Sequence, residues 1–454
     1  MNPQIFREYD IRARVGNDLS AEEVFLLGRA LGTYYRRQGK RRLVVGRDCR
    51  LSSPEWQARL MEALVACGCQ VLDIGMCPTP VLYFAVRDFE AEGGIIVTAS
   101  HNPPEFNGFK ICNGYHTIFG EEIQGLLQLV QGGDFISGAG FMEVREILPA
   151  YQDYLAQNLS ISRPLRMGLD AGHGTAGAVA LPFFRRLGCE VWPLYCEPDG
   201  RFPAHEPDPV IEANLADLKA LVLEQRLDLG VAYDGDGDRL GVIGPRGEII
   251  WGDQLLVLFS RAVLAGHPGA TIIGEVKCSQ RLYDDVARHG GRPLMWKTGH
   301  SLIKQKMVEE GALLAGEMSG HLFFADRYFG YDDAIYATGR LLELLAATGQ
   351  SLTDLLADVP PAYITPEIRR DCPDELKFQV VESVKARLKG LFPIIEVDGV
   401  RFLHPQGWGL VRASNTQPAL VLRFEAISQE ALQEIKDLAE KILSEEITLH
   451  REVR

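Results

Sequence analysis

A strand–helix–strand pattern occurs three times along this chain, and this repetition limits the possible fold more than any other feature. Short apolar runs that predict strands alternate with amphipathic stretches that predict helices. The predicted strands lie at residues 43–45, 71–74 and 95–97, at 167–170 and 190–194, and at 271–275 and 294–296. Strands that alternate with helices form mainly parallel sheets with crossover helices, so we predict three related α/β units.

The part of the chain after Pro360 follows a different pattern. A predicted helix at 375–389 precedes short strands, and another at 429–444 follows them. This order is typical of a smaller α+β unit. A chain of 454 residues is also too long for one ordinary hydrophobic core, so we expect three or four domains.

The overall charge and the termini exclude some classes of protein. A net charge of −14 argues against nucleic acid as the main partner, although a local basic cleft still permits an anionic small substrate. No apolar run approaches a membrane span, and the N-terminus is charged where a signal peptide is apolar. The nine cysteines include no CxxC pair. We therefore expect no membrane association and a cytoplasmic protein with reduced, mostly buried thiols.

The sequence DGDGDR, Asp234 to Arg239, is the strongest chemical signal, because apolar segments that predict buried strands flank it. Asp234, Asp236 and Asp238 alternate with glycines, so they can fold around one hard cation, Mg²⁺ or Ca²⁺. The alternative is an acidic hairpin turn, but three aspartates between buried strands would repel one another without a cation. An EF-hand is excluded, since Arg239 replaces its glycine and Pro245 its glutamate.

Ser100 lies in the sequence TASHNP, directly after the strand predicted at 95–97. Proteins of the α/β class place their chemistry on loops at the carboxyl ends of parallel strands, so this serine could be phosphorylated or act as a nucleophile. The alternative is a serine that caps the N-terminus of a helix. Nearby, His101 could be structural or a base, and Lys110 could be a cation beside the loop or a surface lysine.

Two further polar loops lie in the second half of the chain. In GEMSGH, Glu317, Ser319 and His321 occupy alternate positions, so in an extended loop they would point to one side and suit sugar hydroxyls and proton transfer. The sequence RASNTQP offers a possible phosphate cradle in Arg412, Ser414, Asn415 and Thr416. Taken alone, each of the two could be an ordinary polar turn.

A third loop matches a dinucleotide-binding pattern. Gly172, Gly174 and Gly177 spell GxGxxG after a predicted strand. That fingerprint normally belongs to a first βαβ unit, whereas here it lies in the second, and no other oxidoreductase feature accompanies it. A lone match of this kind is a weak hypothesis.

The four motifs, in this order, resemble those of the α-D-phosphohexomutase superfamily, and most closely its bacterial phosphomannomutase/phosphoglucomutase branch. The resemblance covers nearly the whole chain, from FREYDIR at 6–12 to RASNTQP at 412–418. It implies three topologically similar α/β domains with mixed, mainly parallel sheets, and a smaller C-terminal α+β domain, around a central cleft. The domains expected on this basis are 1–147, 148–249, 250–364 and 365–454.

The resemblance also assigns roles to individual residues. Ser100 would carry the phosphoryl group and, with Asp234, Asp236 and Asp238, would hold Mg²⁺. Glu317 and Ser319 would bind sugar hydroxyls, and Arg412, Ser414, Asn415 and Thr416 would hold the phosphate that does not react. Other positions that match the lining of the family's cleft are Tyr9, Arg12, Lys110, Arg239, Lys277, His300 and His321. Among the side chains near Ser100, the catalytic candidates are Arg12, His101, Lys110, Arg239 and His321.

The activity implied is an isomerase reaction, in which a phosphoryl group moves between C1 and C6 of a hexose phosphate through a hexose 1,6-bisphosphate. The resemblance further implies a monomer and a bisphosphate activator. Phosphoglucosamine mutase is an alternative, although Met318 stands where that branch has glutamine. A metal-dependent phosphatase and a non-catalytic sugar-phosphate sensor also stay open. Two positions depart from the family pattern: Ala13 replaces a glycine, and Gln417 replaces a common glutamate.

Overall fold

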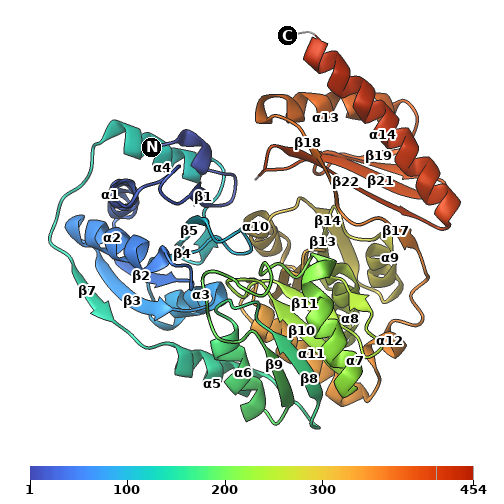
Figure 1. The fold of residues 1–454 in the computed structure, drawn as a ribbon, viewed down its shortest axis with the longest axis horizontal. Coiled ribbons are helices and arrows are strands. Elements are labelled where there is room, and N and C mark those ends of the chain that lie inside the picture. The colour runs from blue at the N-terminus through green and yellow to red at the C-terminus, as the bar shows by residue number, and fades with distance from the viewer. Residues whose placement is uncertain (416, 453–454) are drawn as a thin grey trace.

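The computed structural model describes residues 1–415 and 417–452, which form four sheets in sequence order (Figure 1). The first sheet has seven strands, in the order β1-β5-β4-β2-β3-β7 with β6 beside β5. Its strands are β1 (Ile11–Arg14), β2 (Arg42–Arg47), β3 (Gln70–Met76), β4 (Gly93–Val97), β5 (Phe106–Asn113), β6 (His116–Thr117) and β7 (Phe141–Val144). The helices of this domain are η1 (Pro3–Ile5), α1 (Ala21–Arg37), α2 (Ser53–Ala66), α3 (Thr79–Asp88) and α4 (Glu121–Gly132).

The helices of the first domain begin and pack as their local sequence dictates. Ser20 and Glu23 form a capping box at the start of α1, and Pro54 lies in the first turn of α2. A Cβ on Gly28 would lie 2.6 Å from the Cβ of Ala63. Glycine therefore allows α1 and α2 to cross closely over the sheet.

The second and third sheets have five and four strands, in the orders β12-β11-β10-β8-β9 and β14-β13-β15-β16. The second domain comprises α5 (Leu148–Asn158), β8 (Arg166–Asp170), α6 (Gly177–Arg186), β9 (Glu190–Leu194), η2 (Glu212–Leu215), α7 (Ala216–Gln225), β10 (Leu229–Tyr233), β11 (Leu240–Ile243) and β12 (Ile249–Ile250). The third comprises α8 (Gly252–Gly266), β13 (Thr271–Glu275), α9 (Gln280–Arg288), β14 (Arg292–Trp296), α10 (His300–Glu310), β15 (Leu314–Gly316), β16 (Leu322–Phe324), α11 (Ala334–Thr348) and α12 (Leu352–Leu355).

These three sheets share one topology, as the repeated pattern predicts. Each has three neighbouring parallel strands followed by one antiparallel strand: β3, β2, β4 and β5; β9, β8, β10 and β11; β14, β13, β15 and β16. The loop between the third parallel strand and its antiparallel neighbour therefore occupies the same place in each domain. These three loops carry the TASHNP, DGDGDR and GEMSGH motifs.

The fourth domain is a different unit, with an antiparallel sheet in the order β17-β22-β21-β20-β19 and β18 beside β22. Its elements are β17 (Tyr363–Ile364), β18 (Ile368–Asp371), α13 (Asp374–Lys389), β19 (Ile394–Ile395), β20 (Val400–His404), β21 (Gly407–Ala413), β22 (Ala419–Ala426) and α14 (Gln429–Glu452). Helix α14 runs eight residues beyond the predicted end at Ser444. The extension follows from contacts with α13, where Arg387 pairs with Glu446.

One hydrophobic core joins the first three domains, because buried side chains of α3, α6, β10, α8 and α11 belong to a single cluster. The fourth domain has a core of its own and meets the third through Val276, Trp408 and Leu410. The first three domains are therefore packed as one body, with the fourth attached at its edge (Figure 1). Over the described ranges, no helix combines the length and apolarity that crossing a bilayer requires. The domain boundaries given above stay a prediction.

Candidate active site

The aspartate loop is a tight turn between the antiparallel strands β10 and β11. Asp234, Asp236 and Asp238 are fully buried, and each offers a carboxylate oxygen within 4.8 Å of the others. Gly237 has a φ of 73°, a left-handed conformation that glycine adopts without strain. The backbone of this loop is a hairpin turn, as one interpretation of the sequence has it. The three carboxylates also cluster, as the sequence predicts.

The free oxygens of this loop fit a hard cation. Asp234 Oδ1 accepts hydrogen bonds from the backbone N–H groups of Asp238 and Arg239, at 3.0 and 3.1 Å. The Oδ1 atoms of Asp236 and Asp238, in contrast, are buried and have no hydrogen-bond partner among the described residues. Buried unpartnered carboxylate oxygens are costly, and three carboxylates together favour Mg²⁺ or Ca²⁺. The donor set therefore fits a metal ion.

Lys110 on β5 is the nearest positive side chain. Its Nζ lies 2.7 Å from Asp236 Oδ2 and also contacts Asp238 Oδ2. Burial alone would lower the pKa of Lys110, but the charges of Asp236 and Asp238 outweigh it and raise that pKa. Lys110 is thus a permanent cation beside the loop, and the surface-lysine interpretation is wrong.

Ser100 follows β4 and lies against the aspartate loop. Its Oγ donates to Asp234 Oδ2 at 2.6 Å, and its backbone has a φ of 51°. Its own N–H donates to Thr98 Oγ1 at 3.0 Å. The next regular element is the strand β5, which begins at Phe106, so the helix-cap interpretation of this serine is wrong. A left-handed serine is strained, and such strain often marks functional loops.

His101 lies beside the serine hydroxyl, with its Nδ1 3.1 Å from Ser100 Oγ. Burial, together with the positive charges of Arg239 and Arg12, lowers the pKa of His101 well below its ordinary value. Arg12 reaches the same loop, since its Nη1 donates to Asn102 Oδ1 at 2.6 Å while its Nε donates to Asp10. The sequence-predicted Arg12 and His101 therefore both contact the serine loop.

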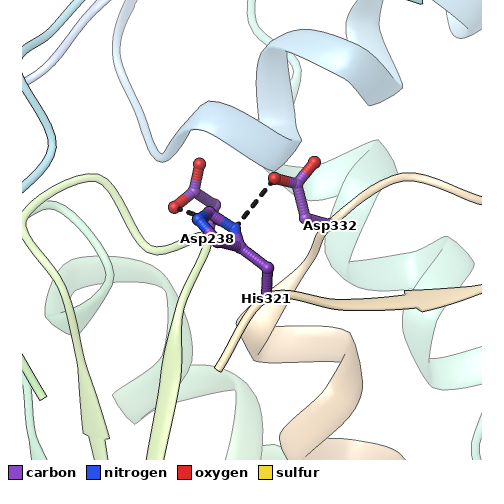
Figure 2. Close-up of side chains that lie close together, drawn as sticks. All are labelled: Asp238, His321 and Asp332. Atoms are coloured by element: carbon purple, nitrogen blue, oxygen red, sulfur yellow. Dashed lines mark ion pairs between the residues drawn. The ribbon is translucent and has the colours of Figure 1, made fainter. Parts of the chain in front are cut away.

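His321 connects the third domain to the aspartate loop (Figure 2). The Nε of Arg239 donates to His321 Nε2 at 2.9 Å, so the ring proton of the neutral histidine lies on Nδ1. That Nδ1 lies 3.0 Å from Asp332 Oδ2 and 3.6 Å from Asp238 Oδ1. The ring of His300 stacks on His321 at 5.6 Å. Asp332 was not predicted from the sequence. The only sequence feature that marks it is the pair of aspartates directly before a predictable helix.

The GEMSGH loop differs from its prediction. The loop is a turn between β15 and β16, in which Glu317 N–H donates to the carbonyl of His321. Ser319 Oγ donates to Glu317 Oε2 at 2.9 Å, and His321 Nδ1 lies 3.0 Å from Asp332 Oδ2. The loop is a turn rather than an extended segment, because the backbone folds back at Gly320, which has a φ of 94°. That Glu317, Ser319 and His321 share one side stays a prediction. Glu317 and Ser319 do lie together.

Arg412 is the penultimate residue of strand β21, and its Nε donates to Asp398 Oδ2 at 2.9 Å. Asn415 Nδ2 donates to Tyr9 OH, which in turn donates to the carbonyl of Thr298 at 2.7 Å. The first, third and fourth domains therefore meet at Tyr9. Ser414 Oγ accepts from the Gln417 N–H at 3.1 Å. Thr416, the remaining predicted residue of this loop, lies outside the described residues.

Lys277 follows β13 and makes contacts that sequence reasoning missed. Its Nζ lies 3.0 Å from Glu367 Oε2 and 3.5 Å from Glu275 Oε1. Glu367 also accepts from Arg369, whose Nη1 donates to Gln417 Oε1 at 2.9 Å. The side chain of Gln417, one of the two positions that depart from the family pattern, thus has a hydrogen-bond partner.

Ala13 is the second position that departs from the family pattern, and it lies in β1 opposite Asn107.

The GxGxxG loop has a packing explanation. A Cβ on Gly174 would lie 2.7 Å from the carbonyl oxygen of Gly235, and one on Gly177 would lie 2.4 Å from that of Cys196. The Thr175 N–H donates to the same Gly235 carbonyl at 3.0 Å. The glycines let this loop press against the aspartate loop, which accounts for them without a dinucleotide.

Comparison with known families finds matches to four successive domains along the chain. The family described as phosphoglucomutase/phosphomannomutase matches through its α/β/α domain I at residues 3–136, domain II at 149–247 and domain III at 251–363. Its C-terminal domain matches residues 367–442.

Individual relatives are similar over almost their whole length. A phosphomannomutase/phosphoglucomutase of Pseudomonas aeruginosa is 49% identical over 433 residues, which are 95% of this chain and 94% of that protein. A phosphoglucomutase of Neisseria gonorrhoeae is 43% identical over 438 residues, 95% of each chain. The crystal structure of a phosphoglucomutase/phosphomannomutase family protein from Burkholderia thailandensis has a TM-score of 0.92, 43% identity and 98% coverage of both chains.

Proposed function

This chain belongs to the phosphoglucomutase/phosphomannomutase family, and we propose that it is an isomerase that moves a phosphoryl group reversibly between C1 and C6 of a hexose phosphate through phospho-Ser100. One observation carries the proposal: the Ser100 hydroxyl lies 2.6 Å from Asp234, within a buried group of carboxylates that fits a metal ion. This contact supports the proposal, because a metal ion held by the carboxylates would supply positive charge beside a phosphoryl group on the serine.

Each remaining loop has a proposed task in substrate binding. Glu317 and Ser319 bind sugar hydroxyls, and Arg412, Ser414, Asn415 and Thr416 bind the phosphate that does not react. The sugar must bind in two orientations, because the group at C1 and the group at C6 must each reach Ser100 in turn. Lys277 and Tyr9 border this space from the third and first domains.

The transfer itself requires a proton acceptor. The bond between phosphorus and Ser100 Oγ breaks as a bond forms to the free sugar hydroxyl, whose proton passes to a base. Ser100 then takes back the second phosphoryl group of the hexose 1,6-bisphosphate and restores the starting enzyme. His101, Lys110, Arg12, Arg239 and His321 are the candidate catalytic residues. Of these, Lys110 and the two arginines carry positive charge, and Nε2 of His321 accepts a hydrogen bond from Arg239.

The metal ion would be Mg²⁺, held by Asp234, Asp236, Asp238 and an oxygen of the Ser100 phosphate. When bound, it supplies positive charge that stabilises the transferring group. A trace of hexose 1,6-bisphosphate would phosphorylate Ser100 and so activate the enzyme. We further propose a monomer in the cytoplasm.

Phosphorus NMR tests this function. The protein is incubated with Mg²⁺, a trace of glucose 1,6-bisphosphate and, in separate samples, mannose 1-phosphate, glucose 1-phosphate or glucosamine 1-phosphate. A growing 6-phosphate signal is expected with the first two sugars. Faster turnover of glucosamine 1-phosphate would assign the phosphoglucosamine branch. Growth of inorganic phosphate would mean that water accepts the group, as in a phosphatase. The variant Ser100→Ala should abolish the signal, and turnover by it would refute the serine mechanism.

A further inference from the structure

Arg50 is a fully buried arginine directly under the serine loop. A guanidinium has five N–H donors, and all five are used here. The Nε donates to Asp48 Oδ2 at 3.1 Å. The four N–H groups of the two Nη atoms donate to backbone carbonyls of the serine loop, at 2.8 Å for Ser100, 2.5 Å for Asn102, 2.7 Å for Pro103 and 3.0 Å for Phe106.

This contact holds the loop in a conformation that it would not keep alone. Ser100 has a φ of 51°, a conformation that is strained for a non-glycine residue and persists only where the surrounding structure imposes it. The Ser100 carbonyl that Arg50 holds also packs against the aspartate loop, because a Cβ on Gly235 would lie 2.5 Å from it. The guanidinium therefore fixes both the serine backbone and its distance from the carboxylates.

The second domain closes over Arg50 from the other side. The ring of Phe202 lies 5.0 Å from the guanidinium carbon, and a Cβ on Gly200 would lie 2.6 Å from the Cα of Arg50. Phe202 itself has a φ of 48°. Two strained residues, Ser100 and Phe202, thus face the same side chain from two domains. Because Arg50 is fully buried, the hydrogen bonds that it donates are shielded from water, which makes them stronger.

We propose that Arg50 is a positioning residue for phosphoryl transfer: its guanidinium sets the place of the Ser100 oxygen relative to the metal-binding carboxylates. The role rests on the proposed phospho-Ser100 mechanism and extends it. Arg50 donates to the carbonyl oxygen of Ser100, whereas Ser100 Oγ contacts His101 and Asp234, so Arg50 acts through the loop. Lysine cannot replace it, since an ammonium offers three donors from one point and cannot reach carbonyls on several sides.

The decisive variant is Arg50→Lys, which keeps the charge and removes the planar set of donors. We expect kcat to fall about 10²-fold, the size of effect that a displacement near 1 Å produces. The KM for glucose 1-phosphate should change about twofold or less, because the loops proposed to bind the sugar and its phosphate belong to the third and fourth domains. The phosphorus NMR signal of phospho-Ser100 should shift or broaden. A purely structural role would lower the thermal midpoint without this kcat-specific loss.

Arg340→Lys is the matched control. Arg340 is also buried and donates twice to Asp326, at 2.8 Å each, but contacts no residue of the proposed site. Its variant should lose stability and keep kcat. A kcat for Arg50→Lys within about threefold of wild type, or an equal kcat loss in Arg340→Lys, would overturn the proposal.

A second variant decides the matter if Arg50→Lys does not fold. Phe202→Ala leaves all five hydrogen bonds but uncovers the guanidinium, and we expect kcat to fall about tenfold with KM unchanged. A wild-type kcat for Phe202→Ala would then refute the role of Arg50.

Ser100→Ala separates the proposed function from the positioning role of Arg50. If it turns over substrate, the proposed function fails; if it is inactive while Arg50→Lys is fully active, only the positioning role fails.

Discussion

Ser100 Oγ and Asp234 Oδ2 are 2.6 Å apart, although 134 residues separate them in the sequence. The contact joins the loop after β4 to the turn after β10, which occupy equivalent places in two repeated sheets. The repeated topology thus brings together the hydroxyl proposed to carry the phosphoryl group and a carboxylate proposed to bind the metal ion. The predictions below test what this arrangement does.

Replacement of Asp238 by asparagine should weaken metal binding and activity together. The variant keeps the shape of the side chain but removes one of the three charges that fit the cation. We expect kcat to fall by at least about 10²-fold at fixed Mg²⁺, and titration calorimetry should show weaker Mg²⁺ binding. Asp134→Asn, at an exposed position, is the control and should change neither quantity. Unaltered Mg²⁺ affinity in Asp238→Asn would remove that residue from the metal site.

Lys110→Met should make the protein depend on metal for stability. The ammonium is the buried partner of Asp236 and Asp238, and removal of one partner of a buried ion pair costs about 3–5 kcal/mol. A cation at the aspartates would offset part of this loss. Mg²⁺ should therefore raise the thermal midpoint of the variant more than that of wild type, measured with and without EDTA. The exposed Lys389→Met serves as control, and equal Mg²⁺ shifts in wild type and Lys110→Met would contradict the prediction.

Arg412→Lys should mainly weaken substrate binding. The Nε of Arg412 donates to Asp398, which orients the planar guanidinium for the two-point contact that phosphate favours. Lysine offers a single point charge instead. We expect KM for glucose 1-phosphate to rise about tenfold, with a smaller change in kcat, in steady-state assays. Arg370→Lys, half-exposed on the same domain, should behave like wild type. A KM unaffected by Arg412→Lys would exclude its role in phosphate binding.

The thiols should be inert in the folded protein. All nine cysteines are outside disulfides, as the sequence predicts, and burial raises the pKa of Cys77 and of Cys112 to about 12. At pH 8 these groups stay protonated, and only the thiolate reacts with alkylating reagents. Mass spectrometry after iodoacetamide should find both unlabelled in native protein and labelled in urea. Rapid native labelling of either would show that its surroundings open.

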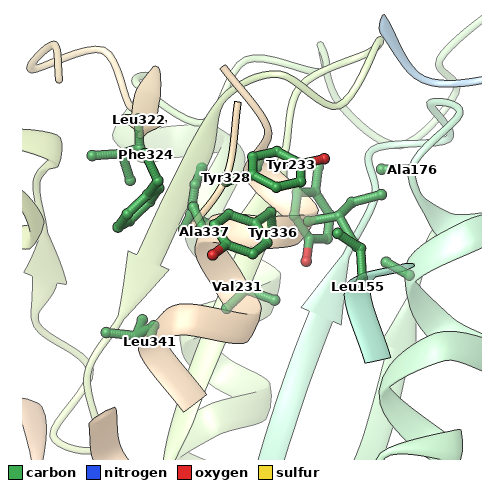
Figure 3. Packing of buried hydrophobic residues seen from close by; sticks show 14 of the residues in the cluster. Leu155, Ala176, Val231, Tyr233, Leu322, Phe324, Tyr328, Tyr336, Ala337 and Leu341 are labelled. Carbon is green, nitrogen blue, oxygen red and sulfur yellow. The ribbon is translucent and has the colours of Figure 1, made fainter. Parts of the chain in front are cut away.

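Stability should depend on pH through Asp333. Tyr328 and Tyr336 stack in the shared core, close to Tyr233 (Figure 3). Asp333 accepts bonds from Tyr328 OH and the Tyr336 N–H, both at 2.8 Å. Burial raises the pKa of Asp333 from 3.8 to about 6. A raised pKa favours the folded state at low pH, and this stability is lost as pH rises through about 6.

The variant Asp333→Asn isolates this contribution, because it cannot titrate. The stability of wild type relative to the variant should decrease by about 2.4 kcal/mol between pH 4 and pH 7. Thermal midpoints of both proteins over that range measure it. A constant difference between the two would mean that the hydrogen bonds of Asp333 keep its pKa near the ordinary value.

Local patterns predicted most of the regular structure because helices and strands bury one face at a fixed period. The strand predicted at 95–97 became part of β4, and the helix predicted at 375–389 became α13 with nearly the same bounds. The helix predicted to end at Ser444 is longer, since its last turns are held by contacts with α13 rather than by its own sequence. Such contacts join distant segments, so no local pattern reports them.

The candidate site divides in the same way. The residue types in DGDGDR and TASHNP indicated a cation site and a reactive serine, because carboxylates and hydroxyls have the same chemistry wherever they lie. Neither motif indicated that Ser100 is left-handed, that Asp332 faces His321, or that Arg50 supports the serine loop. Each of these depends on a partner from another segment.

The sequence by itself determined the repeated α/β pattern, the C-terminal α+β unit and the chemical groups of the four loops. Only the tertiary structure decided which loops meet, which nitrogen of His321 carries the proton, and which carboxylate oxygens are left for a metal ion. The physical reason is that hydrogen-bond partners, burial and electrostatic fields are sums over all neighbours in space. Periodicity along the chain records only which face of each element is buried.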